Sequence, residues 1–195
     1  SLKEYNIAYQ HIDLCADGKV DVPTVLERVS PKTKMIAIQR SRGYAARPSF
    51  TINEIKEMIA AIRPHVGPEA VFFVDNCYGE FVETLEPIEV GADLIAGSLI
   101  KNPGGGIVKM GGYLAGREDL IERCAYRLTT PGIGREAGAS LYSLLEMYQG
   151  LFLAPHVVGE AVKGAVFTAG LLEECGVLST PAWDSPRTDL IQMVA

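Results

Sequence analysis

The sequence predicts an α/β protein built around a mainly parallel β-sheet. Two short apolar runs, residues 71–74 and 93–98, end abruptly in polar and glycine-rich residues, as strands buried on both faces of a sheet do. A third run, residues 34–39, precedes a segment with a helical repeat of isoleucines, at Ile52, Ile55, Ile59 and Ile62. The strand–helix–strand order favours a right-handed parallel crossover, so these strands should share one sheet.

Local patterns predict the remaining elements. Residues 6–14 alternate loosely between apolar and polar side chains, which predicts a first strand. Asp21 and Pro23 open a short helix that should end near Ser30. Thr51 has a glutamate three residues on, which is the capping-box signature of a helix start. A further strand is expected at residues 111–116, followed by helices at 118–126, at 136–149 and, after Pro155, at 157–174.

Composition argues against several classes of function. A formal net charge of −6 provides no basic face for nucleic acid. The apolar stretches are shorter than a membrane span and no secretory leader is recognisable, so we expect a cytoplasmic protein. The four scattered cysteines and three histidines predict neither a disulfide framework nor a metal site. Because the chain starts without methionine and stops inside an apolar run, we expect a fragment of a longer polypeptide.

Polar side chains follow two of the predicted strands at the point where each ends. Asp75 comes directly after residues 71–74, and Ser98 and Lys101 come at and just beyond the end of the next strand. Ligands of open α/β sheets bind at the carboxyl ends of the strands. An aspartate, a serine and a lysine there could hold a cationic ring, a phosphate and a carbonyl. Taken singly, such an aspartate usually caps a turn and such a lysine is usually solvated.

Four segments together resemble a known enzyme family. They are QRSRGY (39–44), VDNCYGEF (74–81), GSLIKNPGGG (97–106) and GGY (111–113). This set resembles the pyridoxal-phosphate (PLP) enzymes of fold type I, in the branch that acts in cysteine and methionine metabolism. Within that branch it is most similar to the methionine gamma-lyase-like subgroup often called aluminium resistance proteins. The resemblance runs along essentially the whole chain, and the combination of motifs carries it.

The resemblance implies a fold and a division into domains. Residues 1–153 would form the large PLP-binding domain, a three-layer α/β/α structure whose N-terminal part is missing. Residues 154–195 would form the connecting helix and the truncated start of an α+β small domain, with strands at residues 176–178 and 187–194. The strand after the lysine would run antiparallel to its neighbours. The implied assembly is a homodimer or homotetramer that binds a small amino-acid substrate, without nucleic acid or membrane.

The resemblance also implies the cofactor pyridoxal 5′-phosphate and roles for four residues. Lys101 would form a Schiff base (an internal aldimine) with the cofactor and later move a substrate proton, with its pKa lowered by burial and nearby cations. Asp75 would keep the pyridine nitrogen protonated, Ser98 would bind the phosphate, and Tyr78 would reach the ring edge or merely pack under a loop. The implied reaction cleaves a carbon–sulfur bond of a sulfur amino acid such as methionine or cystathionine. An aldolase or racemase reaction, and a stress or binding role without turnover, stay open.

Other residues keep more than one interpretation. Arg40, Arg42 and Arg47 could bind a substrate carboxylate, meet a neighbouring subunit, or pair with surface acids. Cys77 is interpreted as a small buried thiol rather than a nucleophile. The glycine run at residues 104–106 is no phosphate loop, because the lysine precedes the glycines. The arginine for the substrate carboxylate and the aromatic that stacks on the cofactor are expected outside this chain.

Overall fold

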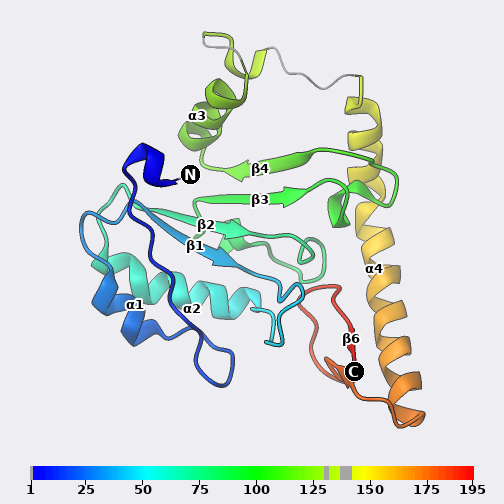
Figure 1. Ribbon diagram of the computed structural model, residues 1–195. Coiled ribbons are helices and arrows are strands. Elements are labelled where there is room, and N and C mark those ends of the chain that lie inside the picture. The colour runs from blue at the N-terminus through cyan, green and yellow to red at the C-terminus, as the bar shows by residue number, and fades with distance from the viewer. Residues whose placement is uncertain (1, 130–131, 137–141) are drawn as a thin grey trace.

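The computed structural model describes residues 2–129, 132–136 and 142–195, and a mixed β-sheet forms its centre (Figure 1). The strands are β1 Met35–Gln39, β2 Val71–Asp75, β3 Leu94–Ser98 and β4 Gly112–Gly116, in this order across the sheet. Strands β1, β2 and β3 are parallel, and β4 runs antiparallel to β3. The α/β class, the mainly parallel sheet and the antiparallel fourth strand are therefore confirmed, whereas the three-layer arrangement stays a prediction.

Helices connect these strands, and two of them begin at the caps that the sequence predicts. Thr51 accepts a hydrogen bond from the backbone N–H of Glu54, whose carboxylate accepts from the N–H of Thr51 in return. Asp21 accepts from the N–H of Thr24 at 3.0 Å. The described helices and 3-10 turns are α1 Val22–Arg28, α2 Ile52–Ile62, α3 Glu118–Leu128, α4 Leu144–Glu174, η1 Leu2–Tyr5, η2 Arg63–His65, η3 Pro87–Val90, η4 Asn102–Gly104 and η5 Gly134–Glu136.

The hydrophobic core lies between α2 and one face of the sheet. Side chains alternate along a strand, and Phe72 and Val74 of β2 face this side together with Ile95 of β3. They pack with Ile55 and Ile59 of α2, and all five are almost completely buried. Asp75 ends β2 and comes directly after Val74, which faces the core. The side chain of Asp75 therefore faces the opposite side of the sheet.

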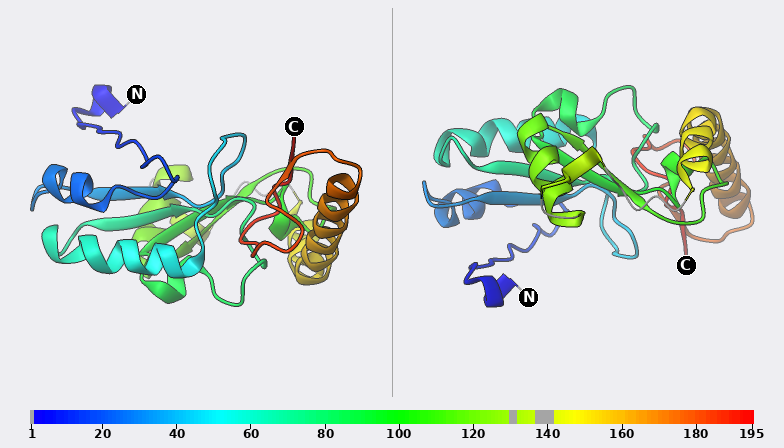
Figure 2. Two further views of the ribbon diagram at one scale, coloured as in Figure 1. Left: turned by 90° about the horizontal axis from the view of Figure 1, so that it is seen from below. Right: turned by 90° about the horizontal axis from the view of Figure 1, so that it is seen from above.

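Helix α4 is one continuous helix of 31 residues that stands across the carboxyl ends of β1, β2 and β3 (Figures 1 and 2). The prediction of two helices, at residues 136–149 and 157–174, is wrong. Residues 137–141 lie outside the described residues, and the helix runs from Leu144 straight through Pro155. An interior proline forfeits one backbone hydrogen bond, at a cost of about 3 kcal/mol. Packing must therefore hold the helix together at this point.

A buried stripe of small side chains supplies that packing. Gly150, Ala154 and Val158 follow one another at helical spacing on both sides of Pro155, and all three are buried. The remaining surface of α4 is largely apolar and exposed, with Phe152 84% accessible. By length and composition alone α4 could also cross a membrane, and 17% of the relevant window is buried in this chain. That the protein has no membrane partner stays a prediction.

The N-terminal strand expected at residues 6–14 is not formed. Leu14 makes an isolated bridge to Val20, and Tyr9 is 70% exposed. The alternating pattern predicted a strand, but a strand also needs a neighbouring strand to share its backbone hydrogen bonds, and the described part of the chain provides none there.

The C-terminal segment forms a two-stranded antiparallel unit beside α4. Its strands are β5 Ser179–Thr180 and β6 Met193–Val194. The strand expected at residues 176–178 is displaced toward the C-terminus, and the strand expected at 187–194 is shortened to its last two residues. The reason is that the intervening residues bind side chains of the first part of the chain instead of pairing as strands, as with Asp189 and Ser41.

Candidate active site

The predicted site residues meet at the carboxyl edge of β2 and β3. Asp75 is the last residue of β2 and Ser98 is the last residue of β3. Because the two strands are parallel, both residues reach the same edge of the sheet. The chain then turns sharply, and the backbone N–H of Lys101 donates to the carbonyl oxygen of Ser98 at 3.2 Å. This turn returns Lys101 to the edge that carries the aspartate.

The thiol of Cys77 lies between these residues. It interacts with the Asp75 carboxylate, with the Lys101 amine and with the backbone of Ser98. The backbone N–H of Cys77 also donates to Oδ1 of Asp75 at 3.1 Å, which orients the carboxylate. Burial raises the pKa of the Cys77 thiol, and the adjacent Asp75 raises it further. A thiol with a raised pKa is a poor nucleophile, so Cys77 acts here as a neutral contact.

Tyr78 lies against the side chain of Lys101. The ammonium nitrogen of Lys101 is 4.2 Å from the centroid of the Tyr78 ring, which is a cation–π contact. Partial burial lowers the pKa of Lys101, but the Cys77 thiol and the Tyr78 hydroxyl outweigh it and raise this pKa above its ordinary value. The expected lowering of the lysine pKa is therefore wrong, because its neighbours are weak acids and not cations.

A buried cluster of polar side chains joins the two loops that carry the site. The hydroxyl of Tyr113, on β4, donates to Oε1 of Glu80 at 2.9 Å, and Nδ2 of Asn76 lies 3.3 Å from the same hydroxyl. Nδ2 of Asn102 donates to the carbonyl oxygen of Glu80 at 2.9 Å. Asn76 directly follows Asp75 in the chain, and Asn102 directly follows Lys101. The cluster therefore fixes the loop after Asp75 relative to the loop that carries Lys101.

Glu80 is the most perturbed carboxyl group of this cluster. It is buried, and its Oε2 has no hydrogen-bond partner among the described residues. Desolvation raises the pKa of Glu80 to about 7. Burial, and then the nearby Glu80, raise the pKa of Tyr113. Neither residue was predicted as part of the site, because nothing in the local sequence shows that a glutamate and a tyrosine from separate segments are buried together.

Arg40 belongs to the core beneath this edge. It is fully buried, its Nη1 donates to Oδ1 of Asn76 at 2.8 Å, and the same nitrogen lies 3.3 Å from Oε2 of Glu86. A Cβ atom on Gly79 would lie 2.6 Å from the Arg40 side chain, so a glycine is required where the guanidinium passes. Arg40 does pair with acids, as one interpretation held, but it does so in the interior and not at the surface.

Arg42 and Arg47 contact backbone carbonyl groups. Nη2 of Arg47 donates to the oxygen of Ser41 at 2.6 Å, and Nε of Arg42 donates to the oxygen of Ala45 at 3.2 Å. Arg42 also lines a cavity of about 400 Å³ whose wall includes Tyr78. Of the three arginines considered from the sequence, Arg42 is therefore the one that shares a cavity wall with Tyr78.

The side chains at this edge fit pyridoxal 5′-phosphate by their chemistry. A carboxylate can hold a protonated ring nitrogen, a hydroxyl can donate to a phosphate, and a primary amine can bond to an aldehyde. Asp75 is oriented by a backbone N–H, and Ser98 and Lys101 are only half-buried, so a ligand can reach both. The residues present are consistent with the cofactor that the sequence resemblance implies.

The model of the methionine gamma-lyase family matches residues 1–195, which is the whole chain. The chain belongs to the methionine gamma-lyase family. A relative from Bacillus subtilis (strain 168), the uncharacterized protein YnbB, is 64% identical over 194 residues, which cover all of this chain and 46% of YnbB. The chain therefore spans about half the length of that relative.

Several solved structures are similar to the chain. A Listeria monocytogenes protein, described as a proposed cystathionine beta-lyase involved in aluminum resistance, is 66% identical with a TM-score of 0.96, over 100% of this chain and 48% of that one. A carbon–sulfur lyase involved in aluminum resistance, from Clostridium novyi NT, is 46% identical with a TM-score of 0.92, over 100% and 46%. Cystathionine gamma-lyase from Lactobacillus plantarum, at 16% identity and a TM-score of 0.56 over 89% and 40%, shares the fold alone.

Proposed function

We propose that the protein is a pyridoxal-phosphate-dependent lyase that cleaves a carbon–sulfur bond of a sulfur amino acid such as methionine or cystathionine. The observation that carries this proposal is the meeting of Asp75, Ser98 and Lys101 around one thiol at the carboxyl edge of the sheet. Membership of the methionine gamma-lyase family supports the lyase class, as does the carbon–sulfur lyase from Clostridium novyi. A cytoplasmic homo-oligomer, with a large domain over residues 1–153 and a small domain starting in residues 154–195, belongs to the same proposal.

Each residue of the site has a role in this chemistry. The bound cofactor would supply an electron sink for the carbanion of the substrate. Asp75 would hold the proton of the ring nitrogen, Ser98 would donate to the phosphate, and Tyr78 would orient the ring edge. Lys101 would hold the cofactor covalently and, once displaced by the substrate amine, would carry a proton from the substrate carbon. Cleavage of the carbon–sulfur bond with addition of water would then yield a keto acid, ammonia and a thiol.

Borohydride reduction of the full-length protein, after incubation with pyridoxal phosphate, tests the covalent role of Lys101. We expect the mass of one reduced cofactor on the peptide that contains Lys101, and none in Lys101→Ala. Lys109→Ala, which removes an exposed lysine of the same segment, should keep the adduct. A folded protein that carries no adduct at Lys101 would exclude the proposed role.

The products distinguish the reaction classes. A lyase acting on methionine or cystathionine releases a keto acid and a thiol in equal amounts. Retro-aldol cleavage of a hydroxy amino acid would release an aldehyde, and a racemase would release neither product. If Lys101→Ala folds but loses turnover, the catalytic proposal is supported. If the protein keeps its biological effect without Lys101, a binding role replaces it.

A further inference from the structure

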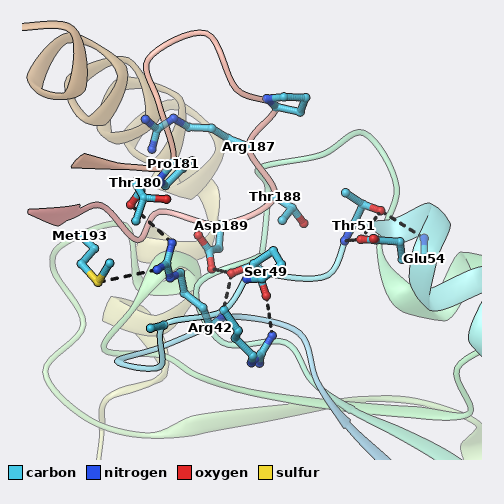
Figure 3. Close-up of a pocket in the computed structure, with 14 residues that line it drawn as sticks. Arg42, Ser49, Thr51, Glu54, Thr180, Pro181, Arg187, Thr188, Asp189 and Met193 are labelled. Atoms are coloured by element: carbon cyan, nitrogen blue, oxygen red, sulfur yellow. Dashed lines mark hydrogen bonds between the residues drawn. The ribbon is translucent and has the colours of Figure 1, made fainter. Parts of the chain in front are cut away.

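A cavity of about 480 Å³ lies between the loop that follows β1 and the C-terminal segment around β5 and β6 (Figure 3). It adjoins the cavity that contains Tyr78, because Arg42 and Met193 line both. The charged residues in its wall are Arg42, Arg47, Arg187, Glu54 and Asp189. Three cationic groups thus face two carboxylates across one cavity.

Both carboxylates are already engaged by other groups. Asp189 accepts hydrogen bonds from the hydroxyls of Ser41, at 2.6 Å, and Ser49, and from the backbone N–H of Ile191 at 3.0 Å. Glu54 closes the capping box of α2. Within residues 2–129, 132–136 and 142–195, no carboxylate lies within ion-pair distance of any of the three guanidinium groups. The positive charge of the cavity is therefore not neutralised by direct contact.

Backbone carbonyl oxygens accept from both terminal nitrogens of Arg47, whereas Arg187 and Arg42 have donors that are unused or weakly used. Arg187 donates from Nη2 to Gln192 at 2.6 Å, but its Nε and Nη1 are buried without a partner among the described residues. Arg42 points toward Thr180 and Met193 (Figure 3), and its contacts are long, at 3.5 Å to the carbonyl oxygen and 3.7 Å to the sulfur. Burial lowers the pKa of Arg187. Buried donors of this kind are normally satisfied, so these nitrogens are available to an acceptor that enters the cavity.

We propose that this cavity binds an oxyanion, the carboxylate or phosphate group of a small ligand, through Arg187 and Arg42. Arginine binds both groups with several N–H donors at once, and both residues have donors that are unused or weakly used. The anion has two possible sources. Because the cavity adjoins the one beside Tyr78, the anion can be a carboxylate of the amino acid bound at Lys101, or it can be a separate small anion. The binding itself does not depend on the proposed lyase reaction.

Calorimetric titration of the full-length protein with succinate and with inorganic phosphate tests the binding. We expect the wild type to bind at least one of the two anions, and Arg187→Gln to bind it at least tenfold more weakly. Arg28→Gln removes the same charge from an exposed position in α1 and should bind as the wild type does. Equal affinities in the wild type and Arg187→Gln, or no binding of either anion to the wild type, would overturn the proposal.

A second variant keeps the test decisive if Arg187→Gln does not fold. Arg187→Lys keeps the charge but loses the planar group with its several donors, so we expect it to fold and to bind more weakly than the wild type. Affinity that is unchanged in a folded Arg187→Lys protein would also count against the proposed site.

Competition identifies the source of the anion. If the ligand is the carboxylate of the amino acid bound at Lys101, succinate should compete with that amino acid, and Arg187→Gln should raise KM more than it lowers kcat. If the anion is separate, succinate or phosphate should bind equally well with the amino acid present. Both results support the cavity as an anion site. A failure of the lyase proposal would appear as absent turnover with anion binding intact.

Discussion

The ammonium nitrogen of Lys101 lies 4.2 Å from the centre of the Tyr78 ring. Tyr78 adopts a left-handed backbone conformation, with φ at 71°, which is rare for a bulky residue and is typical of positions retained for function. The Cys77 thiol also raises the pKa of this lysine. Burial lowers the pKa of Lys101, and two residues of a single short loop, Cys77 and Tyr78, raise it.

Tyr78→Phe should lower the pKa of Lys101, because it keeps the ring but removes the hydroxyl that helps to raise this pKa. A lower pKa leaves more uncharged amine at a given pH, so cofactor attachment should reach its half-maximal rate at lower pH. The measurement is the absorbance change on adding pyridoxal phosphate to the full-length apoprotein across a pH series. Tyr9→Phe, at an exposed tyrosine, is the control. An identical midpoint in Tyr78→Phe and the wild type would show that the hydroxyl has no such influence.

Glu80→Gln should stabilise the protein at alkaline pH. The pKa of Glu80 is raised from 4.5 to about 7 in the folded protein, so the folded state binds this proton more tightly than the unfolded state does. The protonated carboxyl contributes its full share to the free energy of unfolding below pH 4.5. This contribution, about 3 kcal/mol, is lost as the pH rises through about 7. Glutamine does not ionise and avoids the loss.

Urea unfolding of the full-length protein at pH 5 and pH 8 provides the measurement. The unfolding midpoint of Glu80→Gln should exceed that of the wild type by more at pH 8 than at pH 5. Glu27→Gln, at an exposed position of α1, controls for the change in net charge. The explanation fails if the difference between Glu80→Gln and the wild type is the same at both pH values.

Gly104→Ala should disrupt the loop that carries Lys101. A Cβ atom at Gly104 would lie 1.8 Å from the carbonyl oxygen of Leu99, so the backbone itself must move. We expect a loss of about 1–3 kcal/mol in stability, as in overpacked cores, together with weaker cofactor attachment. Gly159→Ala, in α4, has open space around its Cβ position and should instead stabilise the helix by about 0.5–1 kcal/mol.

Melting temperature and the yield of the borohydride adduct measure the two effects separately. If Gly104→Ala melts and attaches the cofactor as Gly159→Ala does, the close approach at residue 104 does not limit the loop.

The sequence predicted those parts of the structure that depend on local pattern. The apolar runs that become β2 and β3 end at the residues where the strands end, and parallel pairing then brings Asp75 and Ser98 to one edge. The capping box at Thr51 is formed as its spacing predicts. Such features depend on neighbours a few residues apart, so one sequence was enough to infer them.

Features that depend on tertiary contacts could not be predicted in this way. Pro155 is normally a helix breaker, but the buried stripe on either side of it keeps α4 continuous. Arg40 looks like a surface cation in the sequence, yet a glycine 39 residues away makes room for it in the core. Two nitrogens of Arg187 have no partner among the described residues. The sequence gives no sign of this, because it results from how distant segments dock.

The hydrogen bond between Ser41 and Asp189 joins residues that are 148 positions apart in the sequence. The same separation divides Arg40 from Thr188, whose hydroxyl accepts a hydrogen bond from the Arg40 guanidinium. Closing a loop of this length costs conformational entropy, so we expect these contacts to form after the local ones. During synthesis, β1 and its loop leave the ribosome long before their C-terminal partners exist. A segment translated 148 positions later therefore completes the end of β1, and the cavity between the two closes only when the chain has folded back onto this strand.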